Sequence, residues 1–445
     1  MRYLPHTEAE RAAMLEVLGL SDVEALFDDI PEAARLRRPL DVPGPLAEWE
    51  LMRTMAERSR QNRSVAAWPC FLGGLFYDRF IPAAVGALAF RGEFATAYTP
   101  YQPELSQGTL ASIYEFQSMM ASLTGMAVAQ ASMYDGASAL AEAVLLAMGA
   151  TGRTAVVCAE GVFPELVQVV ATYVAARGGR IHTAPAGVPL ERAVADLPED
   201  PAAVVMPFPD VYGRFLDGRP VAAAAHARGA LAVAVADPVA LALVEPPGAL
   251  GFDIAVGEGQ PLGNALAYGG PTFGFFAVTE PWVRRMPGRL VGQARDVDGR
   301  RGFVLTLQAR EQHIRREKAT SNICSNHALN ALQATIYLSL LGPEGLREVA
   351  RLSAAKMRYL VRRLEPLGIR PAWPDAPYLY EVAFRVPGSV ADLNRHLLGQ
   401  GIIGGADLGR YDPAWAGLWQ VAVTEKRSRE EIDRLVEGVR TWMSR

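Results

Sequence analysis

The stretch LAVAVADP (residues 231–238) is joined by a short link rich in proline and glycine to DIAVGEGQPLGNALAYGGPTFGFFA (residues 253–277). Each contains a short apolar run that ends in a polar or glycine-rich loop, as buried strands do. Similar runs precede them, with helix-sized segments between: TAVVCAE (154–160) and AAVVMPFP (202–209). Apolar strands separated by helical crossovers are typical of a parallel sheet covered on both faces. Residues 130–280 are therefore predicted to form a doubly wound α/β domain.

Helical patterns precede this domain, and a mixed pattern follows it. The capping sequence SDVE (21–24), a segment opened by Pro45, and LASIYEFQSMMASLTG (110–125) each predict a helix. The arginine-rich residues 287–302 are interpreted as a link to a helical stretch and then to alternating strands and helices. We expect three parts: a helical N-terminal arm (1–60), a large α/β domain with a mainly parallel sheet (61–310) and a small α+β domain (311–445).

Composition argues against several classes of function. The chain has 445 residues, is 50% hydrophobic and carries a net charge of -4. It shows no basic, apolar leader, and no apolar run reaches the ~20 residues that span a bilayer. We therefore expect a cytoplasmic protein that binds neither nucleic acid nor membranes. The chain has three cysteines without paired spacing, Cys70, Cys158 and Cys324, so disulfides are not expected. Its six histidines lack the spacing of metal ligands, so a metal site is not expected either.

Three features fall where parallel sheets bind ligands, beyond the carboxyl ends of strands. Gly136 and Ser138 open a helix whose free N–H groups suit a phosphate, although an ordinary helix cap is the simpler interpretation. Asp237 suits a ring nitrogen, or equally a plain turn. With the glycine-rich loop, this layout is that of fold-type I pyridoxal phosphate enzymes, in which a lysine of the later loop forms the Schiff base. The loop has no lysine, because the chain has only three: Lys318, Lys356 and Lys426.

Several segments together resemble the P-protein, or glycine decarboxylase, of the glycine cleavage system. They are FLGGLFYDRFIPAAV (71–85), TAYTPYQPELSQGTLASIYEFQSMMASLTGM (96–126), ASMYDGASALAEA (131–143), residues 235–277 and IRREKATSNICSNHALNAL (314–332). TPYQPELSQG and REKATSNIC are the most specific motifs, whereas FLGGLFY departs from a family tendency toward a third glycine. The chain is most similar to the N-terminal half that many prokaryotes make as a separate chain, called subunit 1.

The resemblance implies an incomplete half of glycine dehydrogenase (decarboxylating, aminomethyl-transferring). In the family only the other half carries the Schiff-base lysine, in a His-Lys pair that corresponds here to Gln260 and Pro261. The resemblance further implies that the partner subunit decarboxylates glycine on pyridoxal phosphate. The aminomethyl group then passes to the lipoyl arm of the H-protein, within a heterotetramer of two copies of each chain. No catalytic residue is expected in this chain alone, and the vestiges of its own cofactor pocket are expected to be Gly136, Ser138, Asp237 and Gln260.

The chain can still border the active site of its partner. Candidates for this role are the polar and aromatic residues of the loop TAYTPYQPELSQG: Tyr98, Tyr101, Gln102, Glu104, Ser106 and Gln107. It is equally open that these residues only pack the interface between the subunits. Two other classes of function stay open. One is an autonomous pyridoxal phosphate lyase or transferase that uses Lys318, although residues 315–318 are expected to form salt bridges at a domain junction. The other is a purely structural scaffold. For the obligate assembly implied by the resemblance, the N-terminal arm is expected to wrap a partner.

Overall fold

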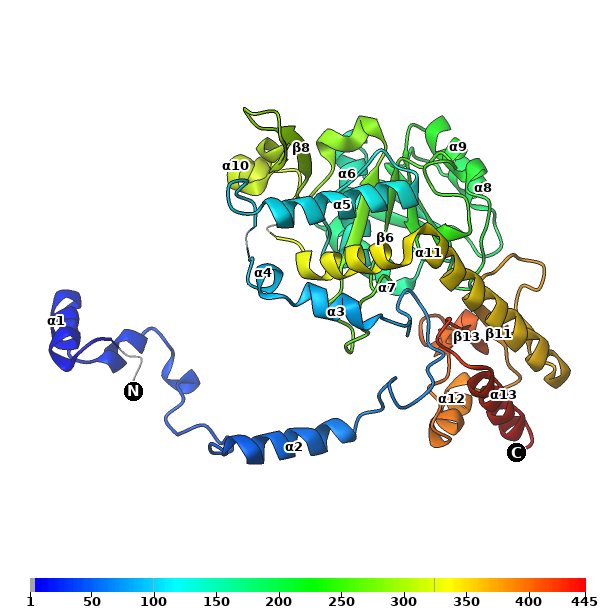
Figure 1. The fold of residues 1–445 in the computed structure, drawn as a ribbon, viewed down its shortest axis with the longest axis horizontal. Coiled ribbons are helices and arrows are strands. Elements are labelled where there is room, and N and C mark those ends of the chain that lie inside the picture. Colours follow the sequence, from blue (N-terminus) through cyan, green and yellow to red (C-terminus); the bar gives the residue numbers. More distant parts are fainter. Residues whose placement is uncertain (1–4, 99, 324) are drawn as a thin grey trace. The chain divides into compact units, whose positions relative to one another are not determined.

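The computed structural model describes residues 5–98, 100–323 and 325–445 (Figure 1). Thr99 of the TPYQPELSQG motif and Cys324 of the REKATSNIC motif lie outside the described residues, as do residues 1–4 of the predicted arm. The chain divides into two units, Met1–Arg63 and Ser64–Arg445. No helix among the described residues is long and apolar enough to cross a membrane. The further division at residue 310 stays a prediction.

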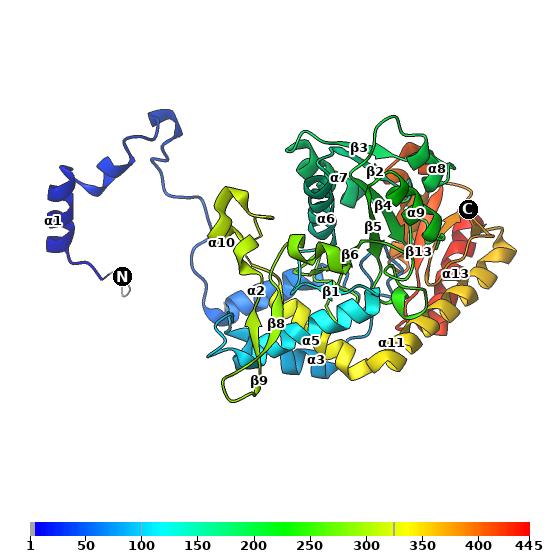
Figure 2. The same cartoon turned by 90° about the horizontal axis from the view of Figure 1, so that it is seen from above.

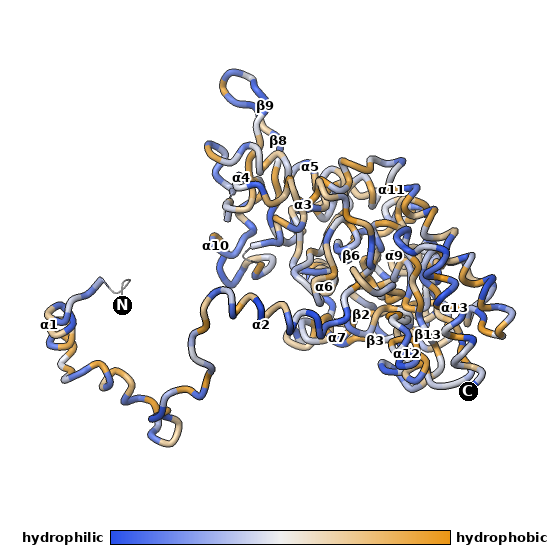
Figure 3. Tube along the Cα trace, turned by 60° about the horizontal axis from the view of Figure 1, so that its bottom comes forward, coloured by the Kyte–Doolittle hydropathy of each residue, from blue (hydrophilic) through white to orange (hydrophobic). Residues whose placement is uncertain are grey.

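The first unit is a series of helices without a core. It contains α1 (Glu8–Leu18), the 3₁₀ helices η1 (Val23–Phe27) and η2 (Glu32–Ala34), and α2 (Glu48–Arg60). None of residues 5–63 is buried, although apolar positions recur along the segment (Figure 3). The predicted helix start at residue 21 is wrong. Asp22 caps η1 instead, because its carboxylate accepts a hydrogen bond from the Ala25 N–H at 3.0 Å.

The second unit is built on a seven-stranded, mainly parallel sheet, counted over the described residues. Its strands are β1 (Val128–Ala129), β2 (Ala155–Cys158), β3 (Arg180–Thr183), β4 (Ala203–Phe208), β5 (Leu231–Ala236), β6 (Ile254–Glu258) and β7 (Gly274–Val278), in the order β1-β7-β6-β5-β4-β2-β3. Strands β3, β2, β4, β5 and β6 are parallel, and β7 runs antiparallel to β6. The doubly wound domain predicted for residues 130–280 is confirmed.

Both faces of this sheet are covered, as apolar strands require. Along β5 the residues alternate between two cores: Val233 and Val235 pack into one, Ala232 and Ala234 into the other. Helices α6 (Gly136–Thr151) and α7 (Pro164–Ala175) cover the first face. The other face carries α5 (Gln107–Thr124), α8 (Leu190–Ala195), α9 (Arg219–Ala227) and part of α11 (Ala328–Leu364), which has a kink at Gly342 (Figures 1 and 2).

A smaller antiparallel sheet lies near the C-terminus. Its strands β10 (Arg370–Pro371), β11 (Glu381–Arg385), β12 (Ala406–Asp407) and β13 (Leu418–Ala422) pair in the order β10-β11-β13-β12. The helices α12 (Val390–Gly399) and α13 (Arg429–Met443) share a separate core with this sheet and with the second half of α11. Phe71, from the start of the second unit, belongs to the same core. The α+β character predicted for the tail is therefore present.

The arginine-rich segment interpreted as a link is instead a hairpin. Strand β8 (Val291–Arg295) pairs with β9 (Arg301–Leu305), and Asp296 closes the turn by accepting hydrogen bonds from the backbone of Asp298 and Arg300. The Asp298-Gly299 pair, whose glycine has φ 80°, is a common turn signal that points to this hairpin. The unit also contains the short α-helices α3 (Ala83–Ala89), α4 (Gly92–Ala95) and α10 (Gln312–Arg315), together with short 3₁₀ helices.

Candidate functional site

The predicted cofactor features lie around the carboxyl ends of β5 and β6. Asp237 directly follows β5, Gln260 lies two residues after β6, and Gly136 begins α6, which packs along β6. The structure therefore places the predicted features at one edge of the sheet. The hydrogen-bond partners of these residues show whether a cofactor could bind at this edge.

The N-terminus of α6 is occupied by carboxylates of the chain itself. The Asp135 side chain accepts from the Ser138 N–H at 2.7 Å, and Glu258 Oε2 accepts from the Gly136 N–H at 3.1 Å. A Cβ atom at Gly136 would lie 2.8 Å from the backbone nitrogen of Glu258, so the loop after β6 packs directly on the helix end. Gly136 and Ser138 thus belong to a helix cap, and the N–H groups that suit a phosphate are already paired.

Glu258 is a buried carboxyl that was not among the residues predicted from the sequence. Its Oε1 accepts from the Gln260 N–H at 2.9 Å, and the Thr272 hydroxyl donates to the same oxygen. Burial raises the pKa of Glu258 to about 7. An acidic residue at the end of an otherwise apolar strand, IAVGE, was the available signal, because such a residue faces the ligand edge of the sheet.

Asp237 is held entirely by groups of this chain. Its Oδ1 accepts from the N–H groups of Val239 and Ala240, at 2.9 and 3.3 Å, which is the turn role left open by the sequence. Its Oδ2 accepts from the Tyr380 hydroxyl at 2.6 Å. Only 3% of the residue is exposed. Both carboxylate oxygens therefore have internal donors, and a tyrosine from near the small sheet takes the position open to a ring nitrogen.

Gln260, which corresponds to the family's lysine region, is 2% exposed and pairs with a distant backbone segment. Its Oε1 accepts from the Tyr77 N–H at 2.9 Å, and its Nε2 donates to the Tyr77 carbonyl at 3.2 Å and to the Asn264 carbonyl at 2.7 Å. The amide thus satisfies both backbone groups of Tyr77. A lysine at this position could donate but could not accept, and the Tyr77 N–H would lose its partner.

Tyr77 and its neighbour Arg79 pack against the residues around Asp237 and Gln260. The Tyr77 hydroxyl donates to Glu381 Oε2 at 2.7 Å, and its ring meets the Tyr380 ring edge-on at 5.7 Å between centroids. The Arg79 guanidinium lies 4.7 Å from the Tyr380 ring centroid and pairs with Glu425 at 2.7 Å. Burial raises the pKa of Glu381 to about 8. We call the following set the closing cluster: Tyr77, Arg79, Asp237, Gln260, Tyr380 and Glu381.

The FLGGLFY motif, which leads into this cluster, carries a backbone conformation that favours glycine. Leu75 stands where the family tends to have its third glycine, and it has φ 78°. Its neighbour Gly74 donates its N–H to Glu381 Oε1 at 2.6 Å. The departure noted in the sequence therefore falls at a position where a side chain is strained but the path of the chain is kept.

The three lysines lie outside the closing cluster. Lys318 is exposed in the 3₁₀ helix η6 (Arg316–Lys318), Lys356 Nζ donates to the Glu425 carbonyl, and Lys426 pairs with Asp78 at 2.7 Å. The salt bridges expected for residues 315–318 do not form among the described residues. Arg315 instead donates to the Ala309 carbonyl at 3.1 Å, because the segment is a short exposed turn that presents these side chains to solvent.

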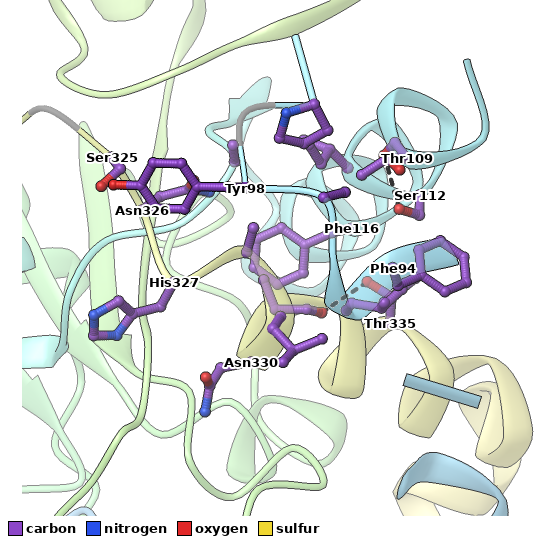
Figure 4. Close-up of a pocket in the computed structure, with 18 of the residues that line it drawn as sticks. Phe94, Tyr98, Thr109, Ser112, Phe116, Ser325, Asn326, His327, Asn330 and Thr335 are labelled. Carbon is purple, nitrogen blue, oxygen red and sulfur yellow. Dashed lines mark hydrogen bonds between the residues drawn. The ribbon is translucent and has the colours of Figure 1, made fainter. Parts of the chain in front are cut away.

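A separate pocket of about 280 Å³ lies between α5 and the start of α11 (Figure 4). Tyr98, which is 85% exposed, and Tyr101 line it. Figure 4 shows the Tyr98 ring beside Ser325 and Asn326. The Tyr101 hydroxyl donates to Asn326 Oδ1 at 3.1 Å. Three polar residues of this pocket were not singled out from the sequence, because they follow a motif interpreted as a domain junction: Asn326, His327 and Asn330.

The other loop candidates do not line this pocket. Gln102 and Glu104 are exposed, and Ser106 stands at the N-cap of α5 without a side-chain hydrogen bond to the helix. Gln107 makes two 2.8 Å hydrogen bonds to the backbone of Phe303 in β9. Gln107 therefore anchors the start of α5 to the hairpin, and the structure brings together only Tyr98 and Tyr101 of the six candidates around one cavity.

Comparison with known proteins identifies the family. The model of the family described as glycine cleavage system P-protein matches residues 1–439. Proteins named probable glycine dehydrogenase (decarboxylating) subunit 1 from Desulforamulus reducens and Geobacillus kaustophilus are 49% and 48% identical to the chain, each over 98% of both sequences. A crystal structure of glycine decarboxylase (P-protein) of the glycine cleavage system, in inhibitor-bound form, matches with a TM-score of 0.86. It is 45% identical over 99% of this chain and 100% of that one.

More distant structures share the fold alone. Alanine–glyoxylate aminotransferase from Nostoc sp. has a TM-score of 0.59 at 17% identity and covers 93% of this chain and 98% of its own. The fold is that of the fold-type I pyridoxal phosphate enzymes, as predicted. The chain belongs to the family of the glycine cleavage system P-protein and, within it, groups with the relatives named subunit 1 of glycine dehydrogenase (decarboxylating).

Proposed function

We propose that this chain is the cofactor-free subunit of glycine dehydrogenase (decarboxylating). A second, homologous subunit would bind pyridoxal phosphate and decarboxylate glycine. The aminomethyl group would then pass to the lipoyl arm of the H-protein. Family membership supports the reaction, and the assembly with two copies of each chain stays part of the proposal. The observation that carries the division of labour is the closing cluster.

Pyridoxal phosphate does not fit the site of this chain. A phosphate at the N-terminus of α6 would meet the carboxylates of Asp135 and Glu258, which already accept the Ser138 and Gly136 N–H groups. A ring nitrogen would have to displace the Tyr380 hydroxyl from Asp237. Gln260 supplies an amide where a nucleophilic amine is needed. Burying further negative charge beside these acids is unfavourable, so we derive no step of the reaction at this site.

The contribution of this chain to catalysis would lie elsewhere on its surface. Tyr98 and Tyr101 stand at a pocket that is open in the single chain, whereas the closing cluster is buried. We infer that this pocket, rather than the vestigial one, borders the active site of the partner subunit. Lys318 offers no support for an autonomous enzyme, since it is exposed and no ion pair with it is formed among the described residues.

The test compares the chain alone with the assembled pair of subunits. Each is incubated with pyridoxal phosphate and freed of excess, and then bound cofactor absorbance and glycine-dependent release of carbon dioxide are measured. We expect neither signal from the chain alone and both from the pair. Retained cofactor and decarboxylation by the lone chain would refute the proposal. Unchanged kcat in the pair after Tyr98→Phe and Tyr101→Phe changes would favour a scaffold role.

A further inference from the structure

The pocket between α5 and α11 is lined only by groups without a permanent charge. Among its lining residues, all within the described chain, none is Asp, Glu, Lys or Arg. Its volume of about 280 Å³ is near the lower end of small-molecule sites, which run from about 300 to 1,000 Å³. The surface of the protein is otherwise rich in charge, with 92 acidic and basic residues in the sequence, 44 plus 48. The lining therefore offers no charged side chain that could pair with a charged ligand.

Apolar side chains provide much of the pocket wall. Phe116 and Ile113 come from α5, Leu332 comes from α11, and Phe94 comes from α4. Figure 4 shows Phe94 and Phe116 among them. Phe116 is 1% exposed and is fixed by an edge-on contact with Phe273 at 5.6 Å. Aliphatic groups that enter this space would be removed from water against packed rings, which is favourable by about 0.8 kcal/mol for each buried methylene.

The polar side chains of the pocket are held in place by neighbours. Asn326 accepts from Tyr101 and donates to the Ser132 hydroxyl at 2.9 Å. Asn330 Nδ2 donates to Asn264 Oδ1 at 2.7 Å and to the Pro271 carbonyl at 3.1 Å. These bonds run to the glycine-rich loop and to the segment before α6. Hydrogen bonds within the chain therefore hold both side-chain amides in place.

His327 adds one directed acceptor to this wall. Its Nδ1 is hydrogen-bonded to the Thr272 carbonyl oxygen. Because a carbonyl only accepts, Nδ1 carries the proton in the neutral ring, and Nε2 keeps its lone pair. The ring also packs near Tyr134, with centroids 5.8 Å apart. A ligand with an N–H group can thus be bound at the polar wall of the pocket.

We propose that this pocket binds the uncharged aliphatic chain and amide of the lipoyl arm that accepts the aminomethyl group. This inference rests on the proposed function, whose other small reactants are charged: glycine is a zwitterion and the cofactor bears a phosphate. Burying either charge here without a counter-ion is costly, whereas a lipoyl amide brings none. Its methylenes match the apolar wall, and its N–H can donate to His327 Nε2. The pocket binds and orients the arm and forms no bond to it.

The experiment narrows the pocket of the assembled enzyme. Ser112 lines the pocket, and its hydroxyl donates only to the Thr109 carbonyl of its own helix at 2.8 Å. Ser112→Phe fills the space. Ser118→Phe is the matched control, because it places the same ring at an exposed position of the same helix outside the pocket. With free lipoamide as acceptor, we expect Ser112→Phe to raise the KM for lipoamide about tenfold, or about 1.4 kcal/mol. The KM for glycine and the bound cofactor absorbance should stay unchanged, as should all values for Ser118→Phe.

A charge variant keeps the test decisive if the filled pocket prevents assembly. Asn326→Asp preserves the shape, can still accept from Tyr101, and lets the Ser132 hydroxyl turn and donate to it. It should also raise the KM for lipoamide, because the new carboxylate must stay hydrated. A raised KM for glycine with an unchanged KM for lipoamide would overturn the assignment in favour of the amino acid. Unchanged values for both substrates would overturn it outright.

A binding measurement separates failure of this inference from failure of the proposed function. Ligand-observed NMR of lipoamide with the full chain, without its partner, needs no turnover. We expect saturation transfer with the natural chain and its loss in Ser112→Phe. An inactive wild-type pair with lipoamide still bound would refute the proposed function and keep the pocket assignment. An active pair whose lone chain binds lipoamide equally in both forms would refute the pocket assignment alone.

Discussion

Asp237 depends on one distant hydroxyl, and this dependence can be measured. In Tyr380→Phe the ring keeps its contacts with Tyr77 and Arg79, while Asp237 Oδ2 loses its donor in a buried position. We expect the free energy of unfolding to fall by about 1–3 kcal/mol, the cost of leaving a buried polar group unpaired. Urea denaturation followed by circular dichroism measures this change.

Tyr378→Phe is the matched control for this substitution. Tyr378 is partly buried two residues away and its hydroxyl has no hydrogen-bond partner among the described side chains, so its loss should change stability by less than about 0.5 kcal/mol. Equal losses in both variants would show that the Tyr380–Asp237 bond does not stabilise the fold.

Buried carboxyl groups make stability depend on pH. Burial raises the pKa of Glu381 from 4.5 to about 8 and that of Glu258 to about 7. The folded chain keeps these protons while the unfolded chain releases them above pH 4.5. The contribution of these groups is therefore constant below that pH, and stability falls as the pH rises toward the folded-state values, by at most about 1.4 kcal/mol per unit of raised pKa.

Glu381→Gln tests this dependence because an amide resembles the protonated carboxyl. We expect the variant to lose less stability than the natural chain between about pH 5 and about pH 8. The measurement is a series of urea midpoints across that range. Glu437→Gln, which changes an exposed residue paired with Arg440, is the control and should keep the natural slope. An identical slope in Glu381→Gln would mean that Glu381 is ionised in the folded chain.

At the scale of elements, α2 exposes large apolar side chains that its own unit does not cover. Trp49 and Met52 lie one turn apart and are 64% and 66% exposed. Apolar surface of this kind marks an interaction site. The double variant Trp49→Ser with Met52→Ser should weaken co-purification with the partner subunit while leaving the melting temperature of the lone chain within about 1 °C, because no core contact is lost.

Substitutions of charged residues on the same helix are the control for this prediction. Glu57→Gln and Arg58→Gln change exposed charges near the end of α2 and should leave assembly intact. Normal assembly of the Trp49, Met52 variant would show that the arm does not contact the partner through this face.

The strands of the large sheet could be predicted because their signal is local. Each is a short apolar run followed by a turn, and helix-sized segments separate successive runs. The closing cluster could not be predicted in this way. Tyr77 and Glu381 are 304 positions apart, and Tyr380 and Asp237 are 143 apart. Periodicity carries no information on such distant pairs. The sequence therefore indicated where the site lies but not that Tyr77, Tyr380 and Glu381 pack into it. The β8–β9 hairpin was missed although its Asp-Gly turn is local, because its arginines obscured the strand pattern.

At the scale of the whole molecule, Asp78 ties the start of the second unit to its C-terminal end. Its carboxylate pairs with Lys426 at 2.7 Å and with Arg427 at 2.8 Å, and its carbonyl accepts from the Thr424 hydroxyl. Arg427 is 2% exposed. In Asp78→Asn the buried Arg427 guanidinium loses the nearer of its two carboxylate partners and keeps only Glu431 at 3.6 Å, so we expect a loss of about 3 kcal/mol in the free energy of unfolding, at the low end for a broken buried pair.

An exposed ion pair, between Arg192 and Asp196, is the control for the buried pair of Asp78. Asp196→Asn removes a surface partner of Arg192 and should cost less than about 1 kcal/mol. Thermal and urea unfolding of both variants compare the two pairs directly. If Asp78→Asn were as stable as Asp196→Asn, the junction between the two ends of the unit would depend on its apolar core rather than on this pair.

The closing cluster also bears on the stability of the folded chain when pyridoxal phosphate is scarce. A ligand that binds only a folded protein stabilises it in proportion to the logarithm of the ligand concentration. Under the proposed function this chain does not bind pyridoxal phosphate, so its resistance to heat and to proteases should not depend on the concentration of the cofactor. We expect it to persist, folded, through deprivation and to be ready for its partner when the supply returns.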